Sequence, residues 1–186
     1  EVSAGELEIT VKRGDVNFGD NTTAGSAQIT LAAGQRGIVS FYKGSTAGSA
    51  TITNDGGTVN FEGAEAGSAT ITNDGTGSKT IFYNVFGGSA ADLGSATITN
   101  SNGGYVSLQG NTDGGSATII NKTGGSAYFE GSAKAAGATV ENQAGGKVVV
   151  RFRDVGDTGA EIGSLTGAGA VALGEYSFET VRLEVG

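Results

Sequence analysis

A seven-residue unit, Gly-Ser-Ala-Thr-Ile-Thr-Asn, constrains the fold of this chain more than any other sequence feature. It occurs three times without change, at 48–54, 67–73 and 94–100. Looser copies precede and follow these three. The alanines of successive copies are 19 to 27 residues apart: Ala27, Ala50, Ala69, Ala96, Ala117 and Ala138. Repeats of roughly 20 residues are typical of solenoids, in which each unit packs only on its neighbours.

Each repeat contains two short stretches in which apolar and polar residues alternate. In the repeated unit, Ala50 and Ile52 alternate with threonines, and a second alternation follows a Gly-rich turn. The apolar pairs of this second stretch are Val39/Phe41, Val59/Phe61, Ile81/Tyr83, Val106/Leu108, Ala127/Phe129 and Val148/Val150. Alternation with period two indicates strands, which bury their apolar faces only when coils stack on one another. The sequence therefore predicts an all-β fold, a parallel β-helix (solenoid) with coils of about 19–27 residues.

The two ends of the chain fit the same scheme, so we expect a single β-solenoid domain over residues 1–186. Its parts are an opening coil (1–24), repeat coils (25–154) and closing strands (155–186). The number of repeats indicates about eight stacked rungs. At about 4.8 Å for each rung, they would form a rod nearly 40 Å long.

The amino-acid composition excludes most kinds of catalytic site. The chain has no histidine and no cysteine, which excludes Ser-His-Asp and Cys-His catalysis, disulfides and an ordinary zinc site. The 35 glycines among 186 residues also disfavour helices, because each costs about 1 kcal/mol in a helix interior. We expect no catalytic residues, no metal site and no cofactor.

The charge balance narrows the choice of partners. Nineteen acidic and eleven basic residues give a net charge of -8, which disfavours binding to nucleic acid or to an anionic membrane surface. The sequence also contains no apolar run of the roughly 18 to 20 residues needed to cross a bilayer. We therefore expect no nucleic-acid partner and no direct membrane insertion.

The repeats and the tail of the chain resemble a known family. Residues 47–54 and 66–73 each give Ala-Gly-Ser-Ala-Thr-Ile-Thr-Asn, followed by a Gly-rich turn, Val-x-Phe or a similar alternation, and residues 162–171 contain Gly-Ser-Leu-Thr-Gly-Ala-Gly-Ala-Val. Together they resemble the passenger domains of bacterial autotransporters over about residues 24–174. The resemblance implies a right-handed parallel β-helix that a C-terminal barrel carries to the outer face of a Gram-negative cell. We therefore expect an extracellular or bacterial cell-surface location and a fragment of a larger surface protein.

Outward threonines are the first candidate binding surface. If Ala50 and Ile52 face inward, the two intervening positions face outward, and stacking of the coils repeats this pair. The resulting ladder contains Thr51, Thr53, Thr70, Thr72, Thr97 and Thr99. Threonine stabilises strands through contacts with like neighbours, so the ladder has a purely structural explanation. It also resembles the Thr-x-Thr faces of ice-binding β-solenoids.

The asparagine at the end of each repeated strand predicts a structural ladder. Its members are Asn54, Asn73, Asn100, Asn121 and Asn142. Stacked amides at one corner of successive coils should bond one another and the turn backbone. The adjacent Asn-Asp-Gly stretches lack the spacing of a calcium loop, so they are interpreted as turns.

Aromatic residues at outward positions of the second strands are the other candidate binding surface. The alternation places Tyr42, Phe82, Tyr105 and Tyr128 outward, and an insertion at 84–93 adds Phe86. Exposed aromatic rings beside polar groups can stack on sugar rings or on a protein. The same rings can instead stabilise the strands by packing between rungs.

The leading functional hypothesis is a non-enzymatic adhesive or spacer scaffold at a bacterial surface, with a host or bacterial surface glycan or protein as its partner. A self-assembling extracellular filament is an alternative, because the open ends of a solenoid can pair with other copies. Ice binding through the threonine ladder is another. A carbohydrate-active enzyme would need aligned carboxylates, whereas Glu62 and Glu130 lie on coils that are not neighbours.

Overall fold

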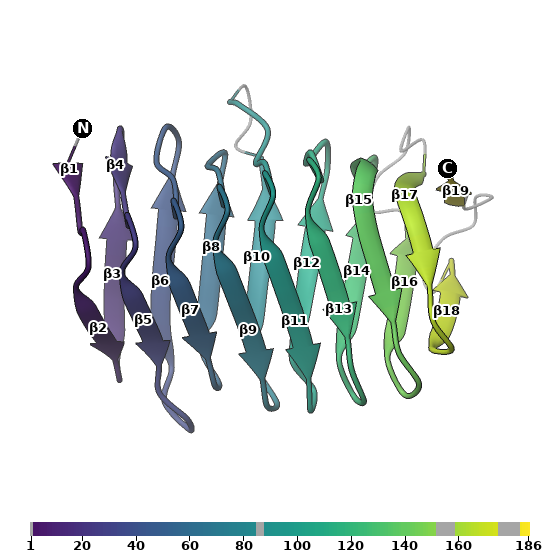
Figure 1. Ribbon diagram of the computed structural model, residues 1–186, viewed down its shortest axis with the longest axis horizontal. Coiled ribbons are helices and arrows are strands. Elements are labelled where there is room, and N and C mark those ends of the chain that lie inside the picture. Colours follow the sequence, from purple (N-terminus) through teal and green to yellow (C-terminus); the bar gives the residue numbers. More distant parts are fainter. Residues whose placement is uncertain (1, 85–87, 152–158, 175–182) are drawn as a thin grey trace.

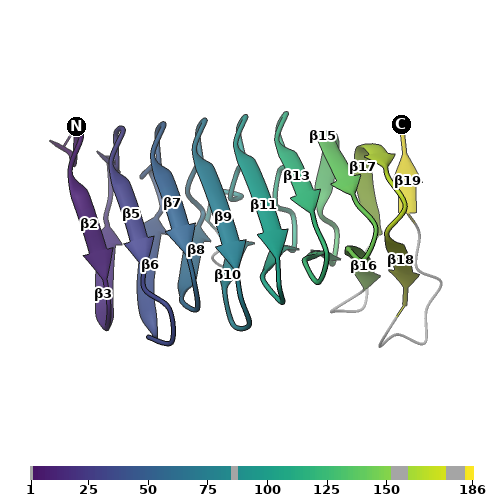
Figure 2. The same ribbon diagram turned by 60° about the horizontal axis from the view of Figure 1, so that its bottom comes forward.

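The protein is an all-β solenoid whose coils stack along one axis. A computed structural model describes residues 2–84, 88–151, 159–174 and 183–186. Figures 1 and 2 show the coils side by side along a rod, with the two termini at opposite ends. The described residues include no helix that is long and apolar enough to cross a membrane. The predicted parallel β-helix is confirmed, and its right hand stays a prediction.

Two parallel sheets form the long walls of the rod. Sheet A, as far as the chain is described, contains nine strands: β2 (Glu8–Val11), β5 (Gln28–Leu31), β7 (Thr51–Asn54), β9 (Thr70–Asp74), β11 (Thr97–Ser101), β13 (Thr118–Asn121), β15 (Lys134–Asn142), β17 (Ala160–Thr166) and β19 (Leu183–Val185). Sheet B contains eight within the same ranges: β3 (Gly14–Phe18), β6 (Gly37–Tyr42), β8 (Thr58–Glu62), β10 (Lys79–Tyr83), β12 (Tyr105–Gln109), β14 (Ser126–Glu130), β16 (Lys147–Arg151) and β18 (Ala170–Leu173). Eight strands in sheet B agree with the predicted number of rungs.

A short third side, which the sequence did not predict, closes each coil. It begins with the pairing of β1 (Val2–Ser3) and β4 (Thr22–Thr23). It continues as single parallel bridges that link Thr23, Thr46, Glu65, Asp92, Asp113 and Lys134 in turn. A single bridged residue in each coil is too short to show period-two alternation, so the sequence pattern did not reveal this side.

The core is built from columns of identical or similar side chains, because parallel strands in register place equivalent residues on top of one another. Ile52 pairs with Ile71 and Ile71 with Ile98, and all three are buried. In sheet B the rings of Phe18, Phe41, Phe61 and Phe82 stack with centroid separations of 4.7, 4.8 and 4.5 Å. These separations match the spacing of neighbouring strands, about 4.8 Å, so each ring covers the next.

The Gly-Ser-Ala part of the repeat forms the corner between the third side and sheet A. Gly94 has φ +58°, and a Cβ atom there would lie 2.4 Å from the carbonyl oxygen of Gly67 on the neighbouring coil. Only glycine fits this conformation and this approach. The following serine donates to the glycine carbonyl of the preceding coil, as Ser68 Oγ does to Gly48 at 3.3 Å. The alanine after it is buried.

The asparagine ladder is confirmed and lies inside the solenoid. Each side-chain amide donates to the next amide oxygen, over distances of 3.0, 3.0, 2.9 and 3.4 Å from Asn54 through Asn142. Asn54 Oδ1 also accepts the backbone N–H of Gly57 at 2.8 Å, which fixes the turn. All five residues are buried, so the ladder satisfies polar groups that would otherwise destabilise the fold.

Candidate binding surfaces

The threonine ladder forms two straight columns on the outer face of sheet A. One column joins Thr51, Thr70, Thr97, Thr118 and Thr139, and the other joins Thr10, Thr30, Thr53, Thr72 and Thr99. Thr51, Thr53 and Thr70 are exposed, whereas Thr72, Thr97 and Thr99 are partly exposed. The predicted outward ladder is therefore present, and each column is longer than the three complete Thr-x-Thr repeats.

The expected outward position of Phe82 is wrong, because β10 has the opposite alternation from the one predicted. Phe82 is fully buried and stacks on Phe61, while Ile81 and Tyr83 face outward. Thr80 also faces the core, where its hydroxyl donates to Asn73 Oδ1 at 3.0 Å. The sequence Lys-Thr-Ile-Phe-Tyr has apolar residues at both alternating sets of positions. Stacking of the larger Phe ring decides which of the two sets is buried.

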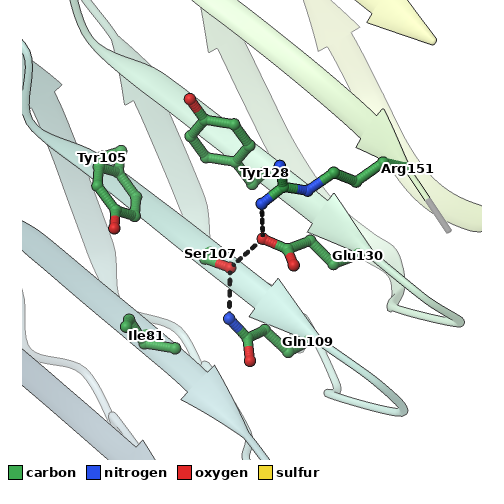
Figure 3. Close-up of a pocket in the computed structure, with 7 residues that line it drawn as sticks. All are labelled: Ile81, Tyr105, Ser107, Gln109, Tyr128, Glu130 and Arg151. Carbon is green, nitrogen blue, oxygen red and sulfur yellow. Dashed lines mark hydrogen bonds and ion pairs between the residues drawn. The ribbon is translucent and has the colours of Figure 1, made fainter. Parts of the chain in front are cut away.

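A hollow of about 330 Å³ lies on the outer face of sheet B. Its lining residues come from four adjacent strands, β10, β12, β14 and β16: Ile81, Tyr105, Ser107, Gln109, Tyr128, Glu130 and Arg151. Figure 3 shows these side chains around one shallow space. Two of the predicted aromatic residues, Tyr105 and Tyr128, are thus brought together in what we call the sheet B hollow.

A chain of hydrogen bonds fixes the polar side of the hollow. Arg151 Nη2 lies 2.8 Å from Glu130 Oε1, which also accepts the hydroxyl of Ser107 at 2.9 Å. The Gln109 side-chain amide donates to Ser107 Oγ at 3.1 Å, and Figure 3 shows these contacts as one connected row. The Glu130 side chain is only 5% exposed. A buried carboxylate needs a paired charge and hydrogen bonds of this kind.

The two tyrosines form the aromatic side of the hollow. The rings of Tyr105 and Tyr128 meet edge to face, with centroids 5.3 Å apart and an interplanar angle of 78°. The guanidinium of Arg151 lies 5.1 Å from the centroid of the Tyr128 ring, a favourable cation–π distance. Burial, together with the nearby Tyr128 and Glu130, raises the pKa of the Tyr105 hydroxyl. Tyr105 therefore remains a neutral hydrogen-bonding group at physiological pH.

Tyr42 lies outside the hollow, toward the N-terminal end of the same face. It is 38% exposed and pairs in register with Glu62, which pairs in turn with Tyr83. The Tyr83 hydroxyl donates to Glu62 Oε2 at 3.0 Å. Burial and this hydrogen bond raise the pKa of Tyr83 to about 12.

The insertion at 84–93 is described only in part. Phe86 lies outside the described residues, so its expected role as a binding residue stays a prediction. Asp92 closes the insertion at the third side, where its Oδ1 accepts the backbone N–H of Gly94 at 2.7 Å. This contact gives Asp92 a structural task, the same one that Thr46 performs for Gly48.

The two carboxylates considered for catalysis are too far apart to act as a pair. Glu62 is on β8 and Glu130 on β14, three strand spacings away, which is about 14 Å. Glycosidases place two carboxyl groups about 5 to 9.5 Å apart. Within the described ranges, no group of three or more acidic side chains is arranged to hold a metal ion.

The polar lining of the hollow was missed from the sequence, although a signal for it exists. Gln109, Glu130 and Arg151 are separated by equal steps of 21 residues, which is also the step between Ala96 and Ala117 and between Ala117 and Ala138. Equal steps place residues in one column of a solenoid.

Comparison of the sequence with models of protein families found no match. A search of curated proteins likewise found no match. The function is therefore inferred from the two outward faces and from the motifs of the repeats.

Proposed function

We propose that this protein is a non-enzymatic surface β-helix of the autotransporter-passenger type, and that it serves as an adhesive scaffold which binds a glycan in the sheet B hollow. The observation that carries the proposal is the meeting of Tyr105 and Tyr128 with a fixed polar row on adjacent strands. A stacked solenoid holds these groups at set distances, which supports recognition without a large conformational change.

The chemistry of the hollow suits a sugar ring better than an apolar ligand. The aromatic faces offer contact to the C–H groups of a pyranose. The side-chain amide of Gln109 and the hydroxyls of Tyr105 and Tyr128, all three partly exposed residues, offer donors and acceptors for its hydroxyl groups. A few placed polar groups beside apolar walls are typical of small-ligand sites. A protein partner would present the same kinds of group through side chains, so it is the other expected ligand class.

Two features support a binding role in place of catalysis. Glu130 is held by Arg151 and Ser107, so its Oε1 atom is already engaged by two partners. The separation of Glu62 from Glu130 also exceeds the distance that glycoside hydrolysis requires. Incubation with a panel of glycans should accordingly yield no cleavage products, and turnover that disappears in Glu130→Gln would contradict the proposal.

Binding to a glycan array tests the adhesive role. We expect the protein to retain a defined subset of neutral glycans, and Tyr105→Ala and Tyr128→Ala each to lower the affinity about tenfold, as expected for loss of an aromatic contact. Thr51→Ala, on the opposite sheet, is the matched control and should bind normally. Equal binding by all four proteins would exclude the hollow as the site.

The surface location needs a separate test. The repeats at 47–54 and 66–73 and the segment 162–171 support an autotransporter-type passenger. Antibodies raised against residues 1–186 should label intact source cells without permeabilisation. Labelling that appears only after permeabilisation would contradict the proposed location and leave the glycan-binding test unaffected.

The threonine columns favour ice binding as a second candidate function. The two columns place hydroxyl and methyl groups on a regular grid, with steps of about 4.8 Å along the axis and about 6.6 Å across it. A grid of this kind can match an ordered surface. The protein should then show thermal hysteresis that Thr70→Tyr and Thr72→Tyr abolish, and an unaltered freezing point would exclude this candidate.

A further inference from the structure

The sheet B hollow continues along the solenoid axis as a column of outward side chains. Glu62 pairs with Tyr42 on one side and Tyr83 on the other, and Glu130 pairs with Gln109 and Arg151. Phe82 pairs with Leu108, so the next residues on these two strands, Tyr83 and Gln109, are also neighbours. We call this set the axial column: Tyr42, Glu62, Tyr83, Gln109, Glu130 and Arg151.

The N-terminal half of the axial column is built like the hollow itself. In the hollow, a hydrogen-bonded Glu130 lies beside aromatic rings. In the other half, Glu62 accepts the hydroxyl of Tyr83 at 3.0 Å, which fixes that ring, and Tyr42 flanks the same carboxylate. Tyr42 is 38% exposed and Tyr83 is partly exposed. Aromatic contact surface is therefore available beyond the hollow.

The spacing of these groups suits a chain that runs parallel to the axis. Each step in the column is one strand spacing, about 4.8 Å, which is similar to the length of one sugar unit in an extended polysaccharide. Tyr83 is one step from Gln109 at the edge of the hollow, and Tyr42 is two steps farther. A linear glycan bound in the hollow would therefore pass over both rings.

The charges of the axial column favour a neutral polysaccharide. The cation in the lining of the hollow, Arg151, is already paired with Glu130 at 2.8 Å. The axial column also contains two carboxylates, and the chain has a net charge of -8. An anionic polysaccharide would meet repulsion along the column, whereas hydroxyl groups can bond to Glu62 and Gln109.

We propose that the axial column extends the hollow into an elongated site for a neutral linear polysaccharide, in which Tyr83 and Tyr42 form outer subsites. This inference rests on the proposed glycan-binding function and adds the form and charge of the ligand. It assigns a binding role to Tyr83, a residue that the predicted alternation placed in the core.

Calorimetric titration with a length series tests the elongated site. The probes are di-, tetra- and hexasaccharides of one neutral linear glucan. We expect the hexasaccharide to bind about tenfold more tightly than the disaccharide, because each added ring contact contributes roughly a further factor of several to ten. Tyr83→Ala should lower the affinity for the hexasaccharide about threefold, because the Tyr42 contact supplies the rest of the gain, and it should leave disaccharide binding unchanged.

Tyr83→Phe is the matched control, since it keeps the ring and loses only the hydroxyl contact with Glu62. It should retain most of the affinity for the hexasaccharide. Unchanged melting temperatures of both variants establish that they remain folded. For the hollow itself, Tyr105→Ala should weaken the binding of every probe, short or long.

The possible failures are distinct. Equal affinity for all three probes, or equal loss in Tyr83→Ala for short and long ones, would overturn the elongated site and leave the hollow intact. No binding of any neutral probe would overturn both proposals. Tighter binding of an anionic polymer such as polygalacturonate would overturn the assignment of a neutral ligand.

Discussion

At the residue scale, the glycines of the repeat are required by two separate constraints. Gly94 combines a positive φ with a close backbone approach, whereas Gly34 has φ +65° and no atom within 4 Å of an added Cβ. The positive φ is a local, conformational constraint. The close approach arises only when a neighbouring coil is present, so substitutions at Gly94 and Gly34 can separate the two effects.

Gly94→Ala should therefore be much more damaging than Gly34→Ala. The positive φ costs an alanine about 1 to 2 kcal/mol at either site. At Gly94 the contact with the Gly67 carbonyl at 2.4 Å adds roughly another 1 to 3 kcal/mol, because the coils must move apart. Urea unfolding of the two variants measures the difference. Equal losses of stability would show that coil spacing adjusts freely.

Tyr83 gives a pH dependence at the same scale. Its pKa in the folded protein is raised to about 12, above the ordinary value near 10 in the unfolded chain. Between these values the unfolded state has lost the proton while the folded state keeps it, so stability is fully present below about pH 10 and falls as pH rises toward 12. Melting temperatures measured across this range should decrease less steeply in Tyr83→Phe. Identical slopes would contradict the raised pKa.

At the element scale, parallel pairing in register stacks equivalent side chains in columns. The stability of each strand therefore depends on the strands on either side of it. The asparagine ladder is the clearest case, because the amide of Asn100 is both the acceptor for Asn73 and the donor to Asn121. Neither neighbour can reach water, since all three residues are buried. A change in one strand therefore leaves polar groups without partners in two others.

Asn100→Leu tests this dependence with little change in volume. It leaves the Asn73 amide and the Asn121 oxygen without these partners, and we expect a loss of about 3 kcal/mol because each buried unsatisfied group costs about 1 to 3 kcal/mol. Thr99→Ala, one residue earlier on the outer face, is the control and should cost less than about 0.5 kcal/mol. Chemical denaturation measures both variants. A neutral Asn100→Leu would mean that the ladder adds no stability.

The strands also show which features of the fold could be predicted from the sequence and which could not. The strands that flank each turn and the asparagine ladder were predicted because their alternation and their position in the repeat are unambiguous. The sequence did not predict which side chains of β10 point into the core, because both Ile81 and Phe82 are apolar. Its alternation was decided by the Phe61 ring, 4.5 Å from Phe82, a contact with a different coil.

At the scale of the whole molecule, the last described strand of sheet B carries exposed apolar side chains. Val171 and Leu173 pair with the buried Val148 and Val150. They are nevertheless 46% and 53% exposed, because β18 is the last strand of sheet B in the described part of the chain. A sheet edge with exposed apolar residues favours pairing with another strand.

We therefore expect end-to-end association of residues 1–186 at high concentration. Sedimentation velocity should show a mean mass that rises with protein concentration. The double variant Val171→Lys, Leu173→Lys should lower this tendency, because charged residues at an edge oppose pairing. Thr51→Lys and Thr70→Lys together add the same charge to the side of the rod and serve as the control. A monomer at every concentration would contradict the expectation.

The sequence by itself determined the architecture, because a repeat of about 20 residues with period-two alternation leaves stacked parallel strands as the arrangement that buries its apolar positions. It also determined the threonine columns and the asparagine ladder, since residues at equal places in a repeat stack directly. Only the tertiary structure decided the third side, the burial of Phe82 and the meeting of Tyr105, Tyr128 and Glu130 in one hollow. These features depend on contacts between coils, which vary with each coil's length and side-chain volume, and no single repeat contains them.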